Sequence, residues 1–429
     1  MNTYEEAIDW IHSRLQLGIK PGLKRMEWLM ERMNHPEHHL RAVHIGGTNG
    51  KGSTVAMMRS MLQEAGYEVG TFTSPYIEQF NERISVNGEA ISDEEIMKLT
   101  AVIKPLAEEL EKTELGSPSE FEVITAMALY YFAWIRPVDI VLFEVGLGGR
   151  LDSTNVIQPL LSVITTIGMD HMQFLGDTLE AIAFEKAGII KNGAPVVSGV
   201  KQEAAREIIQ QRAKEVKSAV YQLGEQFKAD WQRSLPQGEM FHFESVFANM
   251  RDLPTGLNGL HQTENAATAV MAILYLRTFY AFLVEEEHIR AGLQSVSWPG
   301  RMEYAMEQPV VLLDGAHNPE GMKALVASLA ERFPDKKITA LFAGMRDKKL
   351  DEMIAILKQA AHRVAFTSFD FPRAAGKKEF QAFLENQMWI EDWQRFIEEF
   401  QTTAKENEVL IVTGSLYFIS NVKKFIKEK

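Results

Sequence analysis

The sequence contains no cysteine, which excludes a disulfide framework, a thiolate metal site and an acyl-enzyme thioester. Proline is also scarce, with 15 residues in 429, and no tract of low complexity interrupts the chain. Hydrophobic residues make up 46% and charged residues 24%, a balance that disfavours disordered and collagenous proteins. At roughly 150 residues per domain, the length predicts two or three folding units.

Positive charge is in deficit, because 45 Lys and Arg stand against 58 Asp and Glu and give a formal net charge of -13. Proteins that bind nucleic acid generally need a positive surface for the phosphate backbone, so we expect no nucleic-acid partner. Any polyanionic ligand must therefore be held by local groups. We expect small-molecule partners and a monomeric chain.

Long hydrophobic runs are absent as well. The longest, residues 266–284, is interrupted by Arg277, which predicts a buried helix and no membrane insertion. The first fifteen residues carry three acids and lack the basic and then apolar order of a secretory signal. Together with the missing cysteines, these features lead us to expect a cytoplasmic protein.

Short apolar segments followed by glycine-rich turns and helical periodicity predict an α/β fold with a mostly parallel sheet. The expected strands of a first series are residues 41–45, 68–73, 139–145 and 160–167, and those of a second series are 310–313, 338–342, 363–367 and 409–412. The segment 297–301 contains Pro299 and Gly300 and separates the two series. We therefore predict one domain over residues 1–297 and another over 298–429.

A glycine-rich segment at residues 44–54 lies between a predicted strand and a helix predicted over residues 54–65. Its glycines let backbone N–H groups turn inward, and Lys51 can reach terminal phosphates. The spacing departs from the usual phosphate loop, because Gly52 separates Lys51 from the hydroxyls of Ser53 and Thr54. The segment predicts a nucleoside triphosphate site, and the alternative is a glycine-rich turn with a solvated lysine.

Two strand ends carry candidate metal or phosphate ligands. Glu144 ends the strand 139–145, so it should face the same crevice as Lys51, where it could serve Mg²⁺. The strand that starts at residue 160 runs into His171, which could contact metal or phosphate. Taken singly, each residue also fits a purely structural role.

Lys186 falls on the apolar face of a helix for which Asp177 and Glu180 are the expected capping pair. The lysine either snorkels to the surface or is neutral or carbamylated, in which case the carbamate supplies oxygen ligands to a cation. Further along, Asn318 and Pro319 predict a helix start. Capping gives no reason for the neighbouring Asp314.

Several motifs in order resemble the folylpolyglutamate synthase and dihydrofolate synthase family of the Mur ligase superfamily. They are GTNGKGS, TSPYIEQFNERI, FEVGLGGRLDSTN, TTIGMDHMQFLG with FEKAGIIK, LNGLHQTENAATA, WPGRME and DGAHNP, and the later TGSLYFIS is also similar. The resemblance implies a large P-loop ATPase-like domain with a mostly parallel sheet and a smaller Rossmann-like C-terminal domain, with the active site in the cleft between them. The least similar stretch is residues 221–249.

The resemblance also implies roles for individual residues. The implied ATP contacts are Asn49, Gly50, Lys51, Gly52, Ser53, Thr54, Asn265, Arg301, Asp314 and His317. The implied Mg²⁺ ligands or close neighbours are Ser53, Ser74, Glu144 and His171. The implied folate contacts are Phe121, Asp152 and Arg83, and the implied catalytic residues are Lys51, Lys186 as a carbamylated lysine, His171 and Asp152.

The activity that the resemblance implies is ATP-dependent addition of L-glutamate to the carboxylate of a reduced folate, through an acyl phosphate and with Mg²⁺ as cofactor. This chemistry needs no protein nucleophile, in agreement with the missing cysteines. One alternative is addition of glutamate to dihydropteroate, alone or as a second activity. More distant alternatives are a cell-wall Mur ligase and a nucleotide-driven switch or binding protein without ligase activity.

Overall fold

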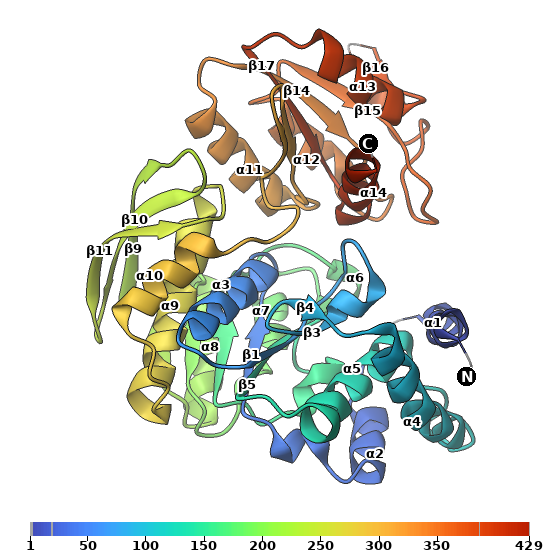
Figure 1. Cartoon of the computed structure of the whole chain (residues 1–429), viewed down its shortest axis with the longest axis vertical. Coiled ribbons are helices and arrows are strands. Elements are labelled where there is room, and N and C mark those ends of the chain that lie inside the picture. The colour runs from blue at the N-terminus through green and yellow to red at the C-terminus, as the bar shows by residue number, and fades with distance from the viewer. Residues whose placement is uncertain (1–2, 19, 386, 429) are drawn as a thin grey trace. The chain divides into compact units, whose positions relative to one another are not determined.

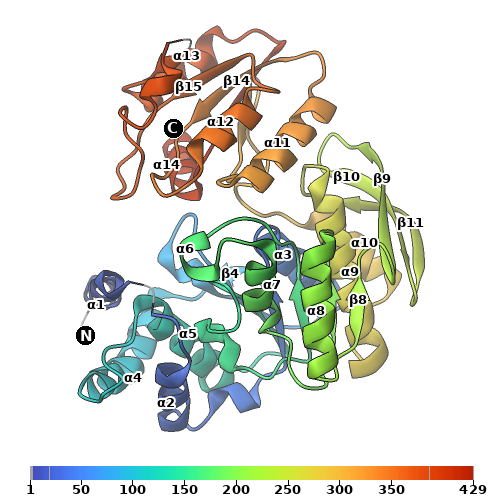
Figure 2. The same ribbon diagram turned by 180° about the vertical axis from the view of Figure 1, so that it is seen from behind.

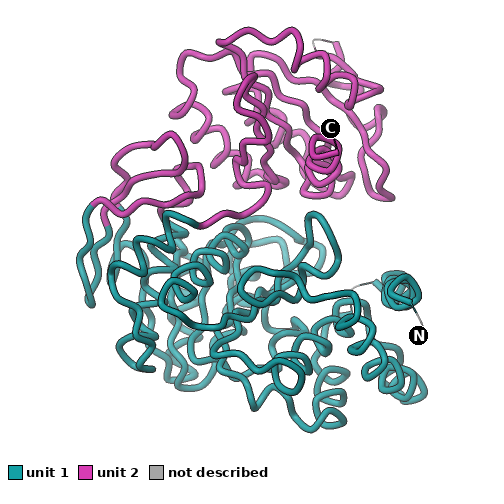
Figure 3. The backbone as a smooth tube through the Cα atoms, in the orientation of Figure 1, with its two compact units in different colours: residues 1–229, 243–251, 264–295 teal, residues 230–242, 252–263, 296–429 magenta. Residues whose placement is uncertain are grey.

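The computed structural model describes residues 3–18, 20–385 and 387–428, so residues 1 and 2 of the first segment lie outside the described residues (Figure 1). The chain divides into two compact units, which Figure 3 shows in different colours. Unit 1 comprises residues 1–229, 243–251 and 264–295, and unit 2 comprises residues 230–242, 252–263 and 296–429. The predicted domain limits near residue 298 stay a prediction.

Unit 1 is built on a sheet with eight strands among the described residues. In sheet order the strands are β4 (Glu89–Ala90), β3 (Ile84–Val86), β2 (Val69–Phe72), β5 (Ile140–Glu144), β1 (Ala42–Gly46), β6 (Leu161–Ile164), β7 (Val196–Ser198) and β8 (Val220–Gln222). The strands from β2 to β8 in this order run parallel, whereas β3 and β4 add an antiparallel edge. The predicted α/β fold is confirmed, and the four strands expected here are present within a few residues.

Helices cover both faces of this sheet, as buried parallel strands require. Figures 1 and 2 show α3, α9 and α10 on one face and α7 and α8 on the other. The bounds are α1 (Tyr4–His12), α2 (Lys24–Arg32), α3 (Lys51–Glu64), α4 (Asp93–Glu111), α5 (Glu120–Tyr130), α6 (Met172–Leu175), α7 (Leu179–Ala187), α8 (Glu203–Glu215), α9 (His261–Tyr280) and α10 (Glu286–Ser295). No helix in the described parts of the chain is both long and apolar enough to span a membrane.

Two helix starts differ from the prediction. Helix α3 begins at Lys51 and not at residue 54, because Gly50 adopts a left-handed conformation (φ 84°) that ends the loop and leaves the next residue free to start the helix. Helix α7 is capped by Thr178, whose hydroxyl accepts the N–H of Ala181 at 3.1 Å, and not by Asp177.

The stretch that matched the motifs least, residues 221–249, contains two strands of a small three-stranded sheet. In sheet order the strands are β11 (Asn249–Thr255), β10 (Glu239–Ser245) and β9 (Phe227–Ser234). Within unit 2, the carboxylate of Glu239 is almost fully buried and pairs with Arg332 at 2.8 Å. The same carboxylate also accepts hydrogen bonds from Trp231, Ser234 and the Gly259 N–H. A buried charge is tolerated when it is paired and hydrogen-bonded in this way.

The main sheet of unit 2 has six strands among the described residues. In sheet order they are β12 (Glu303–Glu307), β13 (Val310–Leu313), β17 (Glu408–Thr413), β14 (Lys337–Phe342), β15 (Arg363–Phe366) and β16 (Met388–Trp389). The helices are α11 (Pro319–Arg332), α12 (Leu350–Leu357), α13 (Trp393–Thr403) and α14 (Leu416–Lys427). All four strands predicted for this region are present, and Asn318 and Pro319 begin α11 as expected.

Candidate active site

The glycine-rich segment joins β1 to α3 at the carboxyl end of the sheet, between the ends of β5 and β6. Gly47 (φ 147°) and Gly50 (φ 84°) have backbone conformations that other residues rarely adopt. At both positions a side chain would also collide with a neighbour. A Cβ atom added at Gly47 would lie 1.9 Å from the Thr165 hydroxyl oxygen, and one added at Gly50 would lie 2.4 Å from the Asn265 side-chain oxygen. The loop therefore needs glycine for two reasons, its turn and its close neighbours.

Two threonines that sequence reasoning missed hold this loop in place. Thr165 and Thr166, which follow β6, both donate hydroxyl hydrogen bonds to the carbonyl of Asn49. The Thr166 hydroxyl also accepts the Asn49 N–H at 2.9 Å, and the Thr48 N–H donates to the Thr166 carbonyl at 2.8 Å. The paired threonines next to a strand end were the only signal that sequence offered for this contact.

Substitution of Gly50 provides a test of the loop, because Gly66 at the other end of α3 has nearly the same φ of 86° but no neighbour within 4 Å. We expect Gly66→Ala to cost about 1–2 kcal/mol from backbone strain alone. Gly50→Ala should cost a further 1–3 kcal/mol, roughly, through the collision with Asn265. Urea unfolding of the two variants gives the comparison, and equal stabilities would contradict the role assigned to Asn265.

The first turn of α3 places two hydroxyls at the loop. Ser53 is 1% exposed and Thr54 is fully buried, and neither hydroxyl oxygen has a hydrogen-bond partner within the described residues. A buried hydroxyl without a partner is unfavourable unless a ligand satisfies it. These oxygens, the helix N-terminus and the glycine cradle fit a phosphate group with a hard cation such as Mg²⁺.

Glu144, Lys51 and Ser74 meet at the carboxyl end of β5. Glu144 pairs in register with Ile45 of β1, is 5% exposed, and accepts the Ser74 N–H at 3.3 Å. The Lys51 ammonium lies 4.0 Å from the Glu144 carboxylate and donates to the carbonyls of Gly47 and Thr48 at 3.2 and 3.3 Å. The prediction that Glu144 faces the same place as Lys51 is confirmed by this distance.

Lys186 is buried on α7, with 4% exposure, and its ammonium donates to the Gly47 carbonyl at 2.9 Å. Burial, and to a smaller extent the nearby Lys51 ammonium, lower the pKa of Lys186 to about 7, although Asp170 and Asp152 act in the opposite direction. The side chain therefore does not snorkel to the surface. A large neutral fraction near pH 7 makes it a nucleophilic amine beside the phosphate loop.

Asp170 and His171 follow β6 and lead into α6. Asp170 is 9% exposed and accepts the N–H of His171 at 2.8 Å, while His171 adopts a left-handed conformation (φ 50°). The His171 ring is 39% exposed, and its Nε2 lies 4.0 Å from the Asp170 carboxylate. Sequence reasoning did not select Asp170, although its position between a strand end and His171 was a usable signal.

Asp152 is buried and fully engaged as an acceptor. One oxygen accepts the Leu147 N–H at 2.8 Å, and the other accepts the N–H and the hydroxyl of Thr154. Burial raises the pKa of Asp152, and the hydrogen bonds from Thr154 and Leu147 oppose that shift. These contacts give Asp152 a positioning role in the loop over residues 147–154.

His44, in β1, extends this network into the sheet. Burial lowers the pKa of His44 to about 3, so the ring is neutral, and its Nε2 lies 2.8 Å from the Thr154 hydroxyl. Because that hydroxyl donates to Asp152, the His44 proton must lie on Nε2 to complete the chain. The glycine-rich segment is thus connected to Asp152 through β1.

The residues expected on the folate side lie near one another. A side chain at Gly146 would meet the Phe121 ring at 2.5 Å, which places this ring against the backbone after β5. Arg83 pairs with Glu120, the residue before Phe121, at 3.2 Å, and its guanidinium lies 5.4 Å from the Tyr76 ring centroid. The Phe121 ring therefore lies against Gly146, two residues along the chain from Glu144, and the Arg83 guanidinium is held by the residue that precedes Phe121.

Three further candidates lie together in unit 2. Asp314 follows β13 and accepts the N–H groups of Met302 and Ala316 at 3.0 and 2.9 Å, and burial raises its pKa. The nearby Arg301 guanidinium opposes this shift and donates to the Gly300 carbonyl at 3.1 Å. His317 Nδ1 lies 2.8 Å from the Gly315 carbonyl. Asp314 thus fixes the turn that carries Arg301 and His317.

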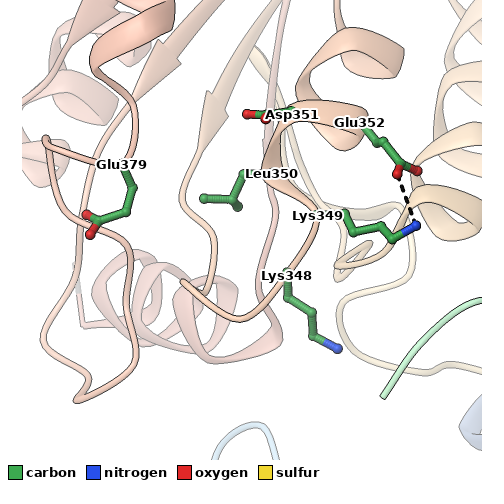
Figure 4. Close-up of a pocket in the computed structure, with 6 residues that line it drawn as sticks. All are labelled: Lys348, Lys349, Leu350, Asp351, Glu352 and Glu379. Atoms are coloured by element: carbon green, nitrogen blue, oxygen red, sulfur yellow. Dashed lines mark ion pairs between the residues drawn. The ribbon is translucent and has the colours of Figure 1, made fainter. Parts of the chain in front are cut away.

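A surface pocket of about 350 Å³ in unit 2 does not coincide with any of these residues. It is lined by Lys348, Lys349, Leu350, Asp351, Glu352 and Glu379. Lys349 is paired with Glu352 at 3.0 Å. Figure 4 shows this pair and shows that Glu379 comes from a separate segment. Exposed charges that pair with each other give no indication of a ligand site.

Comparison with known proteins identifies the family. Two family models match the chain, the Mur ligase middle domain over residues 45–273 and the Mur ligase glutamate ligase domain over residues 300–416. A dihydrofolate synthase/folylpolyglutamate synthase of Bacillus subtilis is 48% identical over 426 residues, which cover 99% of each chain. The chain belongs to the folylpolyglutamate synthase and dihydrofolate synthase family.

Solved structures of family members agree with this assignment. Mycobacterium tuberculosis folylpolyglutamate synthase complexed with ADP has a TM-score of 0.91 at 28% identity, covering 99% of this chain and 98% of that chain. Escherichia coli FolC in complex with DHPP and ADP has a TM-score of 0.88 at 27% identity, covering 100% and 98%. The predicted family, the fold class and the enzyme class, an ATP-dependent ligase, are thereby confirmed.

Proposed function

We propose that this family member adds L-glutamate to the carboxylate of a reduced folate, with ATP as the activating substrate. The observation that carries the proposal is the meeting of the glycine-rich loop, Lys51, Glu144 and Lys186 at the carboxyl ends of β5, β1 and β6. A carboxylate is a poor acyl donor, so amide formation in water needs phosphorylation first. A phosphate-binding loop beside a carboxylate and a neutral lysine suits that step.

We propose that the ATP phosphates bind the backbone and side chains of residues 49–54, with Asn265 beside Gly50. Mg²⁺ would be held by Ser53, Ser74 and Glu144, with His171 as the predicted close neighbour, and it would neutralise charge on the phosphates. Support comes from the unpartnered buried hydroxyl of Ser53 and from the hard oxygen donors in this set.

In the proposed reaction a folate carboxylate oxygen attacks the γ-phosphorus, the bond to ADP breaks, and an acyl phosphate forms. Lys51 neutralises charge on the transferred group, and inward N–H groups of the loop orient it. The glutamate amine then attacks the acyl carbon, loses a proton, and phosphate leaves. Of the two predicted proton acceptors, partly exposed His171 is favoured over Asp152, whose oxygens already accept three hydrogen bonds. In this role His171 lies beside the Mg²⁺ and does not coordinate it, because a neutral imidazole has a single acceptor nitrogen.

We propose carbamylation of Lys186 as part of the same site. A carbamate forms when a neutral amine attacks CO₂ and loses a proton, and the lowered pKa of Lys186 supplies the neutral amine near pH 7. The carbamate would then lie at the phosphate loop, next to Gly47, and its oxygens would serve as metal ligands. The nucleotide contacts of Arg301, Asp314 and His317, the folate contacts of Phe121, Arg83 and Asp152, the monomeric state and the cytoplasmic location stay predictions.

A second activity, addition of glutamate to dihydropteroate, is favoured by the Bacillus subtilis relative, whose name carries both activities at 48% identity. The deciding experiment incubates the protein with ATP, Mg²⁺ and glutamate and offers dihydropteroate and reduced folates separately. We expect products heavier by one glutamate residue, measured by mass, and phosphate release that needs both the pterin substrate and glutamate. ATP hydrolysis that is independent of glutamate would instead indicate a nucleotide switch.

A further inference from the structure

The segment between α2 and β1 carries a compact group of metal-binding side chains. In and beside η2 (Pro36–His39), His35 Nδ1 lies 2.9 Å and His38 Nε2 lies 3.5 Å from the same Glu37 oxygen. Among the described residues, this is the one group of three His, Cys, Asp or Glu ligand atoms that all lie within 4.8 Å of one another. We propose that His35, Glu37 and His38 bind one zinc-type divalent ion.

The spacing of the ligand atoms fits a tetrahedral ion. Bonds of about 2.0–2.1 Å to imidazole nitrogen and carboxylate oxygen place neighbouring ligand atoms roughly 3.3 Å apart. The two observed separations lie on either side of this value. The side chains of His35 and His38 are 47% and 65% exposed, so a water molecule or an outside ligand can complete the shell.

The burial of Glu37 gives an independent reason for a cation. Its side chain is 7% exposed, and its second oxygen, Oε2, is buried without a hydrogen-bond partner in the described chain. Its ion-pair partners there are His35 and His38, and no lysine or arginine pairs with it. A buried carboxylate without a permanent positive charge is unfavourable. A divalent ion supplies that charge, and two imidazoles favour zinc-type ions over Mg²⁺, which prefers oxygen.

This site is separate from the phosphate loop. The cluster precedes β1, whereas the loop follows it, and five residues of strand at about 3.3 Å each separate the two by roughly 16 Å. Next to the cluster, the His39 ring lies 4.5 Å from the Trp134 ring, and the Trp134 indole donates to the Met33 carbonyl at 3.3 Å. A bound ion would therefore fix the turn over residues 35–38, next to the contacts that His39 and Met33 make with Trp134.

Titration calorimetry with ZnCl₂ tests the proposal on the full chain, after treatment with a chelator and with excess Mg²⁺ present to fill oxygen-rich sites. We expect one zinc ion per chain and a melting temperature that rises with zinc concentration. The double variant His35→Ala/His38→Ala should weaken zinc binding at least about 100-fold and lose the thermal shift. His39→Ala is the matched control, because it removes a neighbouring imidazole outside the cluster and should leave zinc binding unchanged.

Zinc binding of equal affinity in the double variant would place the ion elsewhere and overturn the proposal, as would the absence of binding to the native chain. Glu37→Gln provides a second variant that keeps the side-chain shape and removes its charge. It should weaken zinc binding at least about 10-fold. Circular dichroism of each variant, with ADP binding as a check on the distant loop, shows whether the fold is retained.

Discussion

Replacing Lys186 by alanine should lower kcat/KM at least about 10³-fold while the protein stays folded. The physical reason is that the buried lysine, and the carbamate proposed on it, lies within hydrogen-bond distance of the Gly47 carbonyl at the phosphate loop. Steady-state phosphate release in the presence of both substrates measures the change. Near-normal activity of the variant would remove Lys186 from the proposed metal shell.

Loss of the Lys186 amine should lower activity but raise the stability of the folded protein. Lys186→Met removes a buried amine, so we expect a gain of about 1–4 kcal/mol in the free energy of unfolding, measured in CO₂-free buffer. In the folded state the pKa of Lys186 is lowered from 10.5 to about 7, so its burial destabilises the native protein most below pH 7. This penalty shrinks as pH rises through 7 toward 10.5. The stability gap between variant and native protein should therefore narrow over that range.

Lys191 supplies the matched control for Lys186. It is a partly buried lysine whose pKa is lowered to about 8, mainly by burial, but its ammonium donates to the Asn155 carbonyl at 2.7 Å and not to the loop. Lys191→Met should alter stability without comparable loss of activity. A ¹³C carbamate signal that grows between pH 6 and pH 8 in protein supplied with ¹³CO₂, and that disappears in Lys186→Met, would identify the modification directly. A pH-independent signal that survives in that variant would contradict it.

Replacing Lys51 by alanine should lower kcat by roughly 10²–10³-fold and weaken ADP binding. Lys51 is the first residue of α3. Its ammonium lies 4.0 Å from the Glu144 carboxylate and donates to the carbonyls of Gly47 and Thr48 in the loop. No other described residue of the loop over residues 47–54 carries a positive charge. The loss should therefore appear in the phosphoryl-transfer step, measured by single-turnover formation of ADP.

The Lys51→Arg variant tests whether the charge of this side chain or its shape matters more. It keeps the positive charge but replaces a compact ammonium with a wider guanidinium, so ADP binding should recover more than kcat does. Lys104→Ala removes a partly exposed lysine that pairs with Glu108 at 3.8 Å, and it should change neither quantity. If the Lys51→Ala variant bound ADP and catalysed the reaction like the native protein, the proposal that Lys51 stabilises the phosphate would be wrong.

Local patterns in the sequence determined a large part of the architecture. The strands of both series, the helix start at Asn318 and Pro319, and the glycine-rich turn depend on hydrophobic period, capping chemistry and glycine, which act between residues close in the chain. The facing of Glu144 toward Lys51 also followed, because strands that lie side by side in a parallel sheet end at the same edge. The start of α3 was misplaced, since only the backbone shows that Gly50 closes the loop.

Contacts between distant residues were decided only by the tertiary structure. Thr165 and Thr166 hold a loop that lies more than a hundred residues earlier in the chain. The carboxylates of Asp152 and Asp314 accept hydrogen bonds from backbone N–H groups. A sequence shows which groups can form hydrogen bonds but not which partners remain after folding. The chain by itself thus determined the elements and the chemical class of the site, while packing decided which charges are buried, neutral or already engaged.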